Sequence, residues 1–172
     1  PNSYSVGMSN LGFQTVYRLL NALEGVVCER AFAPDAAPSQ NPPVVTLESG
    51  RPLNAFDVVA FSLSFENDTP TVLSLLRRAG LPLYSEDRGS VHPLVMAGGV
   101  ACFLNPEPLA PFIDLFMLGE AEEMLPAFFD AFDPGADRRE LLLRLARNQP
   151  GLYVPAFYHA RYHSDGSLEA FT

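Results

Sequence analysis

Two apolar segments, each running directly into a glycine loop, constrain the fold of this 172-residue chain more than any other feature. Within LVMAGGVACFLNPEPLAPFIDLFMLGEAEEMLP, residues 94–126, Leu94–Ala97 precedes Gly98-Gly99 and Ile113–Leu118 precedes Gly119-Glu120. Short, continuous apolar runs are typical of parallel strands that are buried on both faces. Ligands of open α/β sheets bind beyond the carboxyl ends of such strands, where glycines let backbone amides come close. The stretch therefore predicts a sheet with a ligand site at that edge.

Further strands and helices alternate along the chain. The run DVVAFSLSF from Asp57 predicts another buried strand, and Asp68 or Thr69 can cap a helix that has Pro70 in its first turn and ends at Gly80. Periodicity also predicts helices over 13–23, 121–131 and 137–147 and a strand over 26–32, whereas four prolines within 33–43 preclude regular structure.

This alternation favours one fold class, an α/β, doubly wound and mostly parallel sheet of the flavodoxin-like or Rossmann-like kind. In a flavodoxin-like order, the first strand would lie partly or wholly before Asn2. The last part of the chain differs, because Asp165-Gly166 separates two alternating apolar segments and predicts a type I′ β-hairpin. We therefore expect a domain over residues 1–148 and an antiparallel hairpin appendage over 149–172.

Composition limits the function. The net charge of −9 disfavours nucleic acids and membrane surfaces as partners, because both attract Lys and Arg. No apolar run suits a membrane helix and no signal peptide is visible, so we expect a cytoplasmic protein. The two cysteines, Cys28 and Cys102, do not suit a zinc site or a disulfide scaffold, and His159 and His163 are interpreted as surface residues.

Four loops are expected to meet at the carboxyl edge of the sheet and to form a crevice. They are residues 2–12, 64–68, 98–105 and 119–123. Glu66, Glu120, Glu122 and Glu123 would repel phosphates there and suit a ligand with amide or hydroxyl donors. Glu122 and Glu123 are also ordinary first-turn residues of a helix, which leaves Glu120 as the better ligand candidate.

Catalytic equipment is not evident in the sequence. It contains no G-x-S-x-G, G-x-x-x-x-G-K-[ST] or strand-linked G-x-G-x-x-G motif. Cys102 has no histidine placed beside it, so a small buried residue is a better interpretation than a nucleophile. Ser62 and Ser64 are either buried hydroxyls bonded to the backbone or a polar row facing a ligand. The chain by itself is not expected to be catalytic.

A family resemblance adds to this interpretation. The segments PNSYSVGMSNLGFQTVY, DVVAFSLSFEND, MAGGVACFLNPEPLAPFIDLFMLGEAEE and GLYVPAFY together resemble the N-terminal region of cobalamin-binding-type radical S-adenosylmethionine (radical SAM) proteins. The resemblance implies a flavodoxin-like domain that precedes a barrel, and a barrel that holds a 4Fe-4S cluster and S-adenosylmethionine. It also implies that the strand-end loops hold the corrin of cobalamin (vitamin B12). The implied contacts are Ser62, Ser64, Glu66, Gly98, Gly99, Val100, Ala101, Gly119 and Glu120.

One departure from the family pattern affects the expected ligation. Many cobalamin domains carry a D-x-H-x-x-G motif, but the matching spacing here is Asn2-x-Tyr4-x-x-Gly7, and counting back from Gly12 places Ser9 at the histidine position. The expected function is therefore an accessory domain that binds cobalamin without a histidine ligand. The alternative is a degenerate domain that binds no cofactor and serves in docking or substrate orientation, and a flavin or nucleotide site is a third, weaker option.

Overall fold

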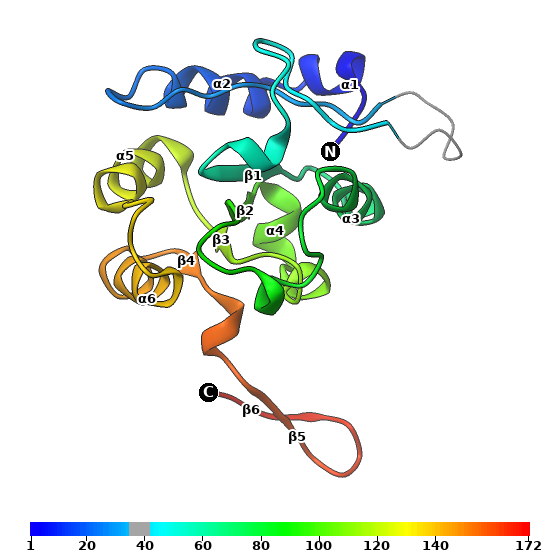
Figure 1. Cartoon of the computed structure of the whole chain (residues 1–172). Coiled ribbons are helices and arrows are strands. Elements are labelled where there is room, and N and C mark those ends of the chain that lie inside the picture. The colour runs from blue at the N-terminus through cyan, green and yellow to red at the C-terminus, as the bar shows by residue number, and fades with distance from the viewer. Residues whose placement is uncertain (35–41) are drawn as a thin grey trace.

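A computed structural model describes residues 1–34 and 42–172 of the chain; the middle of the proline-rich stretch, residues 35–41, lies outside the described residues. Its main sheet has the order β1-β2-β3-β4 (Figure 1). The strands are β1 (Val58–Ser62), β2 (Leu94–Gly98), β3 (Leu115–Met117) and β4 (Leu152–Tyr153). The strands β1, β2 and β3 are parallel, and Val58 of β1 lies opposite Leu94 of β2. The strand β4 is antiparallel to β3.

Helices cover both faces of this sheet, which confirms the α/β, doubly wound and mostly parallel architecture. In Figure 1, α3 (Thr69–Arg78) and α4 (Val100–Leu104) lie on one side of the strands, and α5 (Ala121–Ala131) and α6 (Arg138–Asn148) lie on the other. Two predicted helix signals are confirmed: Pro70 lies in the first turn of α3, and Gly80 follows α3 with φ +69°. Asp68 is the N-cap residue of α3 but makes no side-chain capping bond, whereas Asp137 caps α6 through its side chain.

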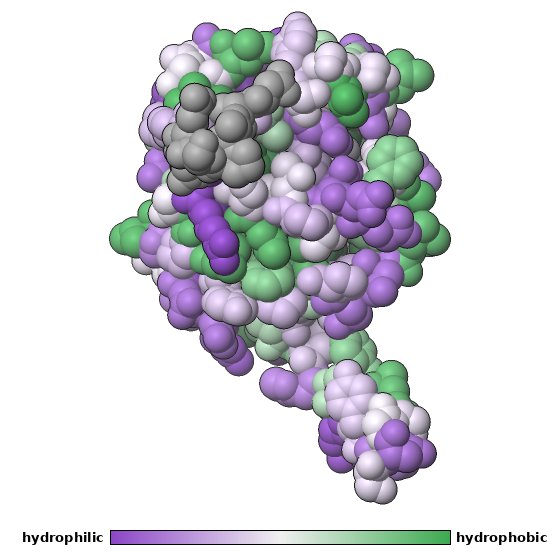
Figure 2. Space-filling view, turned by 90° about the vertical axis from the view of Figure 1, so that its right-hand side faces the viewer, coloured by the Kyte–Doolittle hydropathy of each residue, from purple (hydrophilic) through white to green (hydrophobic). Residues whose placement is uncertain are grey.

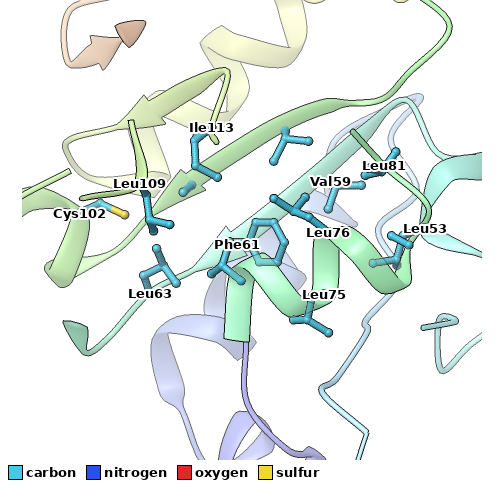
Figure 3. Close-up of a cluster of buried hydrophobic side chains, with 14 of the residues drawn as sticks. Leu53, Val59, Phe61, Leu63, Leu75, Leu76, Leu81, Cys102, Leu109 and Ile113 are labelled. Carbon is cyan, nitrogen blue, oxygen red and sulfur yellow. The ribbon is translucent and has the colours of Figure 1, made fainter. Parts of the chain in front are cut away.

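Alternate residues along the strands pack into two separate hydrophobic cores, one on each face of the sheet. On the α3 side, Phe61, Val95 and Phe116 pack with α3, Cys102 and Leu109. Figure 3 shows this cluster with Cys102, Leu109 and Leu63 at one end and Leu53 and Leu81 at the other. On the opposite face, the next residues along the strands pack with α5 and α6. They are Leu94, Met96, Leu115 and Met117. The strand β2 is therefore buried on both faces, as its unbroken apolar sequence predicts.

The N-terminal part forms a layer of α1 (Tyr4–Met8) and α2 (Leu11–Leu20), which lies beyond β1 in Figure 1. Asn10 caps α2, since its side chain accepts a hydrogen bond from the backbone N–H of Phe13 at 2.9 Å. The predicted strand over 26–32 is wrong. This segment forms no ladder and is held by single bonds, such as the one from the Leu47 N–H to the Arg30 carbonyl at 2.7 Å.

Short 3₁₀ helices make up most of the remaining regular structure. They span Leu53–Ala55, Glu66–Asp68, Ser85–Asp87, Glu107–Leu109 and Pro155–Phe157. No helix among residues 1–34 and 42–172 is long and apolar enough to cross a membrane.

The predicted C-terminal hairpin is present as β5 (Ala160–Tyr162) and β6 (Leu168–Phe171). It projects away from the body of the molecule (Figures 1 and 2). Its turn differs from the predicted type I′: the Gly166 N–H bonds the His163 carbonyl, and Gly166 has φ +85°. This pattern matches a longer turn closed by a glycine bulge, so Asp165-Gly166 occupies the end of the turn and not its centre.

Candidate functional site

The carboxyl end of β1 is organised by one buried carboxylate, that of Asp68. It accepts hydrogen bonds from the backbone N–H groups of Ser64 and Phe65 and from the Asn2 side chain, each at 3.3 Å. The Ser64 hydroxyl also accepts a bond from Asn10 Nδ2 at 2.9 Å. These contacts bring residues 2–12 and 64–68 side by side, as the loop convergence predicted.

The loop after β2 packs directly on the end of β1. The Leu63 N–H donates to the Gly98 carbonyl at 2.8 Å, and the Leu63 carbonyl accepts from the Ala101 N–H at 3.2 Å. Gly99 has φ +106°, and a Cβ there would lie 2.4 Å from the Leu63 carbonyl oxygen. Gly99 is therefore required for the packing of the two strand ends. A ligand contact at Gly99 stays a prediction.

The loop after β3 begins α5. A Cβ on Gly119 would lie 2.8 Å from the Met124 sulfur, so this glycine also permits close packing. Glu120 is the N-cap residue of α5 but makes no side-chain capping bond, and it is exposed. Its carboxylate, with those of Glu122 and Glu123, lies at the positive end of the helix dipole.

The nine predicted contact residues are thus distributed unevenly. Ser62 and Gly98 are opposite each other in the register of β1 and β2 and are partly buried. Ala101 is buried in the α3-side core, so its side chain is not available to a ligand at this edge. The others are at least partly accessible at the ends of the three strands; these are Ser64, Glu66, Gly99, Val100, Gly119 and Glu120.

Exposed apolar side chains form the main surface feature at this end, and sequence reasoning missed most of them. Phe65, Val100, Phe103 and Leu104 have relative exposures of 66%, 56%, 68% and 68%. Val100, Phe103 and Leu104 lie on one face of α4, at positions i, i+3 and i+4, while Ala101 and Cys102 face the core. The available signal was the sequence VACFL, which is apolar on both faces of a five-residue helix. We call these four residues the strand-end patch.

Two hollows in the described surface lie away from this edge of the sheet. One of about 390 Å³ is lined by α2 and Arg30, whose guanidinium is paired with Glu48 at 2.7 Å. Another of about 110 Å³ lies at the amino end of the sheet, beside Asp57, His92 and Arg138. None of the nine predicted contact residues lines either hollow. The carboxyl ends of the strands therefore offer an accessible surface, and neither of these two hollows is part of it.

Thiols and imidazoles do not assemble into a reactive centre in the described residues. Burial raises the pKa of the Cys102 thiol to about 12, which suits the predicted core role, and burial raises that of Cys28 to about 11. His92 lies near the amino end of β2, where its Nδ1 accepts a bond from the Gly89 N–H. No group of three metal-ligating side chains occurs within residues 1–34 and 42–172.

The amino end of the sheet has a different chemistry, which the sequence did not predict. The Asp114 carboxylate is buried and pairs with Arg88 at 3.3 Å and with Arg138 at 2.9 Å. It also accepts a bond from the Val95 N–H at 2.7 Å. Arg88 is buried as well, and burial lowers the pKa of its guanidinium despite the opposing charge of Asp114. The network joins β2, β3 and the start of α6.

Comparison with known proteins identifies the family. Residues 12–155, most of the chain, match the family described as "Radical SAM proteins, N-terminal". No curated protein and no solved structure matches the chain. The matched range covers the sheet and all four helices packed on its faces, and it ends before the hairpin. The chain therefore belongs to the radical SAM N-terminal family.

Proposed function

We propose that this domain is an accessory module of a radical SAM protein and that it docks through the strand-end patch on the catalytic domain of the same polypeptide. The observation that carries this proposal is the 56–68% exposure of Phe65, Val100, Phe103 and Leu104. Fully burying a large apolar side chain is worth about 1.5–3 kcal/mol, so four exposed apolar side chains at one end of the sheet favour a partner. In this proposal the 4Fe-4S cluster and S-adenosylmethionine are held by the catalytic domain.

The chemistry around the patch supports a protein partner. α4 is apolar on both faces, a pattern typical of helices that are covered on both sides. Glu66 lies beside Phe65 and the whole chain carries a charge of −9, so a basic rim on the partner would complement the edge of the patch. Iron–sulfur clusters need several cysteine thiolates, and Cys102 is buried in the core, so the described residues do not suit a cluster.

Hydrogen exchange in the whole radical SAM protein tests docking. The amides of α4 are expected to exchange about tenfold more slowly in the whole protein than in the chain of residues 1–172. Phe103→Glu in the whole protein should restore fast exchange, because it places a charge in the apolar contact. Val91→Glu is the matched control, since Val91 is 86% exposed and lies at the amino end of the sheet. Equal exchange of α4 in both proteins would reject the proposal.

Cobalamin binding without a histidine ligand is the second candidate. The observation that favours it is the combination at one face of an apolar surface with the exposed acceptors Glu66 and Glu120, because a corrin has an apolar ring and peripheral amides. Ser64 would add a hydroxyl to these contacts. In this proposal cobalamin supplies its cobalt chemistry, while these residues bind and orient the ring.

Gel filtration after mixing with hydroxocobalamin tests this candidate. The visible absorbance of the corrin should co-elute with the whole protein, and Phe103→Glu or Glu120→Gln should reduce the bound fraction while Val91→Glu does not. No co-eluting corrin with the whole protein would reject cobalamin binding. Slowed exchange of α4 would still support docking in that case, so the two proposals fail separately.

A further inference from the structure

Residues 1–17, which we call the N-terminal segment, carry no charged side chain although they lie at the surface. The chain has 11 basic and 20 acidic residues among 172, so a segment of this length would carry about three at the average frequency. None of the 17 residues is buried. Helices at a protein surface normally present charged side chains to water. The segment that forms α1 and the first part of α2 therefore lacks the ordinary chemistry of a solvated surface.

Apolar side chains of the N-terminal segment remain in water. Leu11, the first residue of α2, is 79% exposed, and Tyr4 and Val6 of α1 are each more than half exposed. The inner side of the same layer is already packed, because Val16 and Leu19 lie against the core that contains α5 and α6. The exposed apolar side chains thus belong to the outer side of a layer whose inner side is satisfied.

A hydrogen bond joins the N-terminal segment to the strand-end patch. Asn10 Nδ2 donates to the Ser64 hydroxyl at 2.9 Å, and Leu11 and Phe65 are the residues that follow this pair in the sequence. The loop after β2, which leads into α4, packs on the same end of β1. The start of α2, the loop that carries Phe65 and α4 therefore lie along one edge of the sheet.

We propose that the N-terminal segment and the strand-end patch form one docking surface, and that Leu11 is buried against the same catalytic domain as Phe103. This extended surface rests on the proposed docking of the strand-end patch, to which it adds a second contact. The core of a protein–protein interface is depleted of charged residues and enriched in aromatic ones. Both parts share the lack of charge, since residues 93–106, which include α4, also carry no charged side chain. The partner is expected to present an uncharged, apolar surface to both.

Exchange of the α4 amides tests whether the two parts act together. In the whole radical SAM protein, Leu11→Glu should speed this exchange about tenfold, because it places a charge in the apolar contact. Val27→Glu is the matched control: Val27 is 76% exposed, and it lies by the other end of α2, where the Asn21 side chain bonds the backbone of Cys28. Neither substitution should change the exchange of α4 in residues 1–172, because both side chains lie in water there.

The outcomes separate the extended surface from the docking on which it rests. Slow exchange of α4 that persists in the whole protein after Leu11→Glu would overturn the extended surface and leave docking of the strand-end patch intact. Fast exchange of α4 in the unsubstituted whole protein would reject docking itself, and the extended surface with it.

Photo-cross-linking provides a second measurement, which does not depend on stability. A photoreactive phenylalanine analogue placed at Leu11 of the whole protein should link to the catalytic domain, as should one placed at Phe103, whereas one placed at Val27 should not. Peptide mass spectrometry locates the links. Links from Phe103 without any from Leu11 would contradict a shared surface.

Discussion

The two ends of the sheet differ in how completely their chemistry is satisfied within the domain. At the amino end, Asp114 uses both carboxylate oxygens on Arg88, Arg138 and the Val95 N–H, all inside the protein. At the carboxyl end, glycines bring the strand-end loops together and the strand-end patch remains in water. The amino end therefore stabilises the domain, while the carboxyl end, where ligands of open α/β sheets bind, leaves apolar side chains accessible.

Removing Asp114 should give the largest effect. Asp114→Ala leaves the buried Arg88 guanidinium without its carboxylate, and breaking a buried ion pair typically costs about 3–5 kcal/mol. Urea unfolding of residues 1–172 measures this loss. The exposed Asp130 provides a control, because Asp130→Ala should change the free energy of unfolding by less than about 0.5 kcal/mol. A loss below about 1 kcal/mol for Asp114→Ala would refute a stabilising role for the amino end.

Substitution of Gly99 separates packing from ligand approach. Gly99→Ala should destabilise residues 1–172 by about 2–4 kcal/mol, because it combines a strained positive φ with an overlap on the Leu63 carbonyl. Gly89→Ala is the control, since a Cβ there meets nothing within 4 Å and φ is not positive. If Gly99→Ala left stability unchanged without any ligand, the glycine would have to be explained by ligand binding instead.

The contact between Tyr153 and Glu107 holds β4 to the connection between β2 and β3, and it should have an intermediate effect. The Tyr153 hydroxyl donates to Glu107 at 2.6 Å, so Tyr153→Phe should cost about 0.5–1.5 kcal/mol near neutral pH.

The Tyr153 contact also predicts a pH dependence. Burial, and then the bond to Glu107, raises the pKa of Tyr153 above its ordinary value of 10.0. The raised pKa means that the folded state favours the neutral phenol of Tyr153. The stabilisation by this phenol is therefore present below pH 10 and is lost as the pH rises above 10. Unfolding curves of the normal protein and Tyr153→Phe should therefore converge above pH 10. A constant difference between them would contradict the assignment.

Sequence patterns predicted the strands that are buried on both faces and the helix ends that depend on neighbouring residues. The apolar runs of β2 and β3, the first turn of α3 at Pro70 and the end of α3 at Gly80 could all be predicted, because each depends on a few neighbouring residues. The segment over 26–32 could not be predicted correctly, since whether a strand-like sequence joins a sheet depends on its tertiary contacts, which no local pattern shows.

The sequence predicted where the candidate site lies better than it predicted the roles of the residues there. The strand-end loops do meet, because parallel strands bring their carboxyl ends to one edge. The role of Gly99 depends on its distance from Leu63, which is 36 residues earlier in the chain and is not visible in any local pattern. The same holds for the ion pairs of Asp114 with Arg88 and Arg138, whose partners are 26 and 24 residues away.

Substitution within the strand-end patch should have the smallest effect on residues 1–172. Phe103→Ser removes a side chain that is 68% exposed, so the free energy of unfolding should change by no more than about 0.5 kcal/mol. Phe116→Ala, which removes a fully buried ring, should cost about 3–5 kcal/mol in the same urea experiment. A large loss for Phe103→Ser would mean that the patch stabilises the domain itself, and the contrast between the two ends of the sheet would disappear. The proposed docking predicts a small loss of stability for Phe103→Ser in residues 1–172. It also predicts that the same substitution speeds the exchange of the α4 amides in the whole protein, where Phe103 would contact the partner.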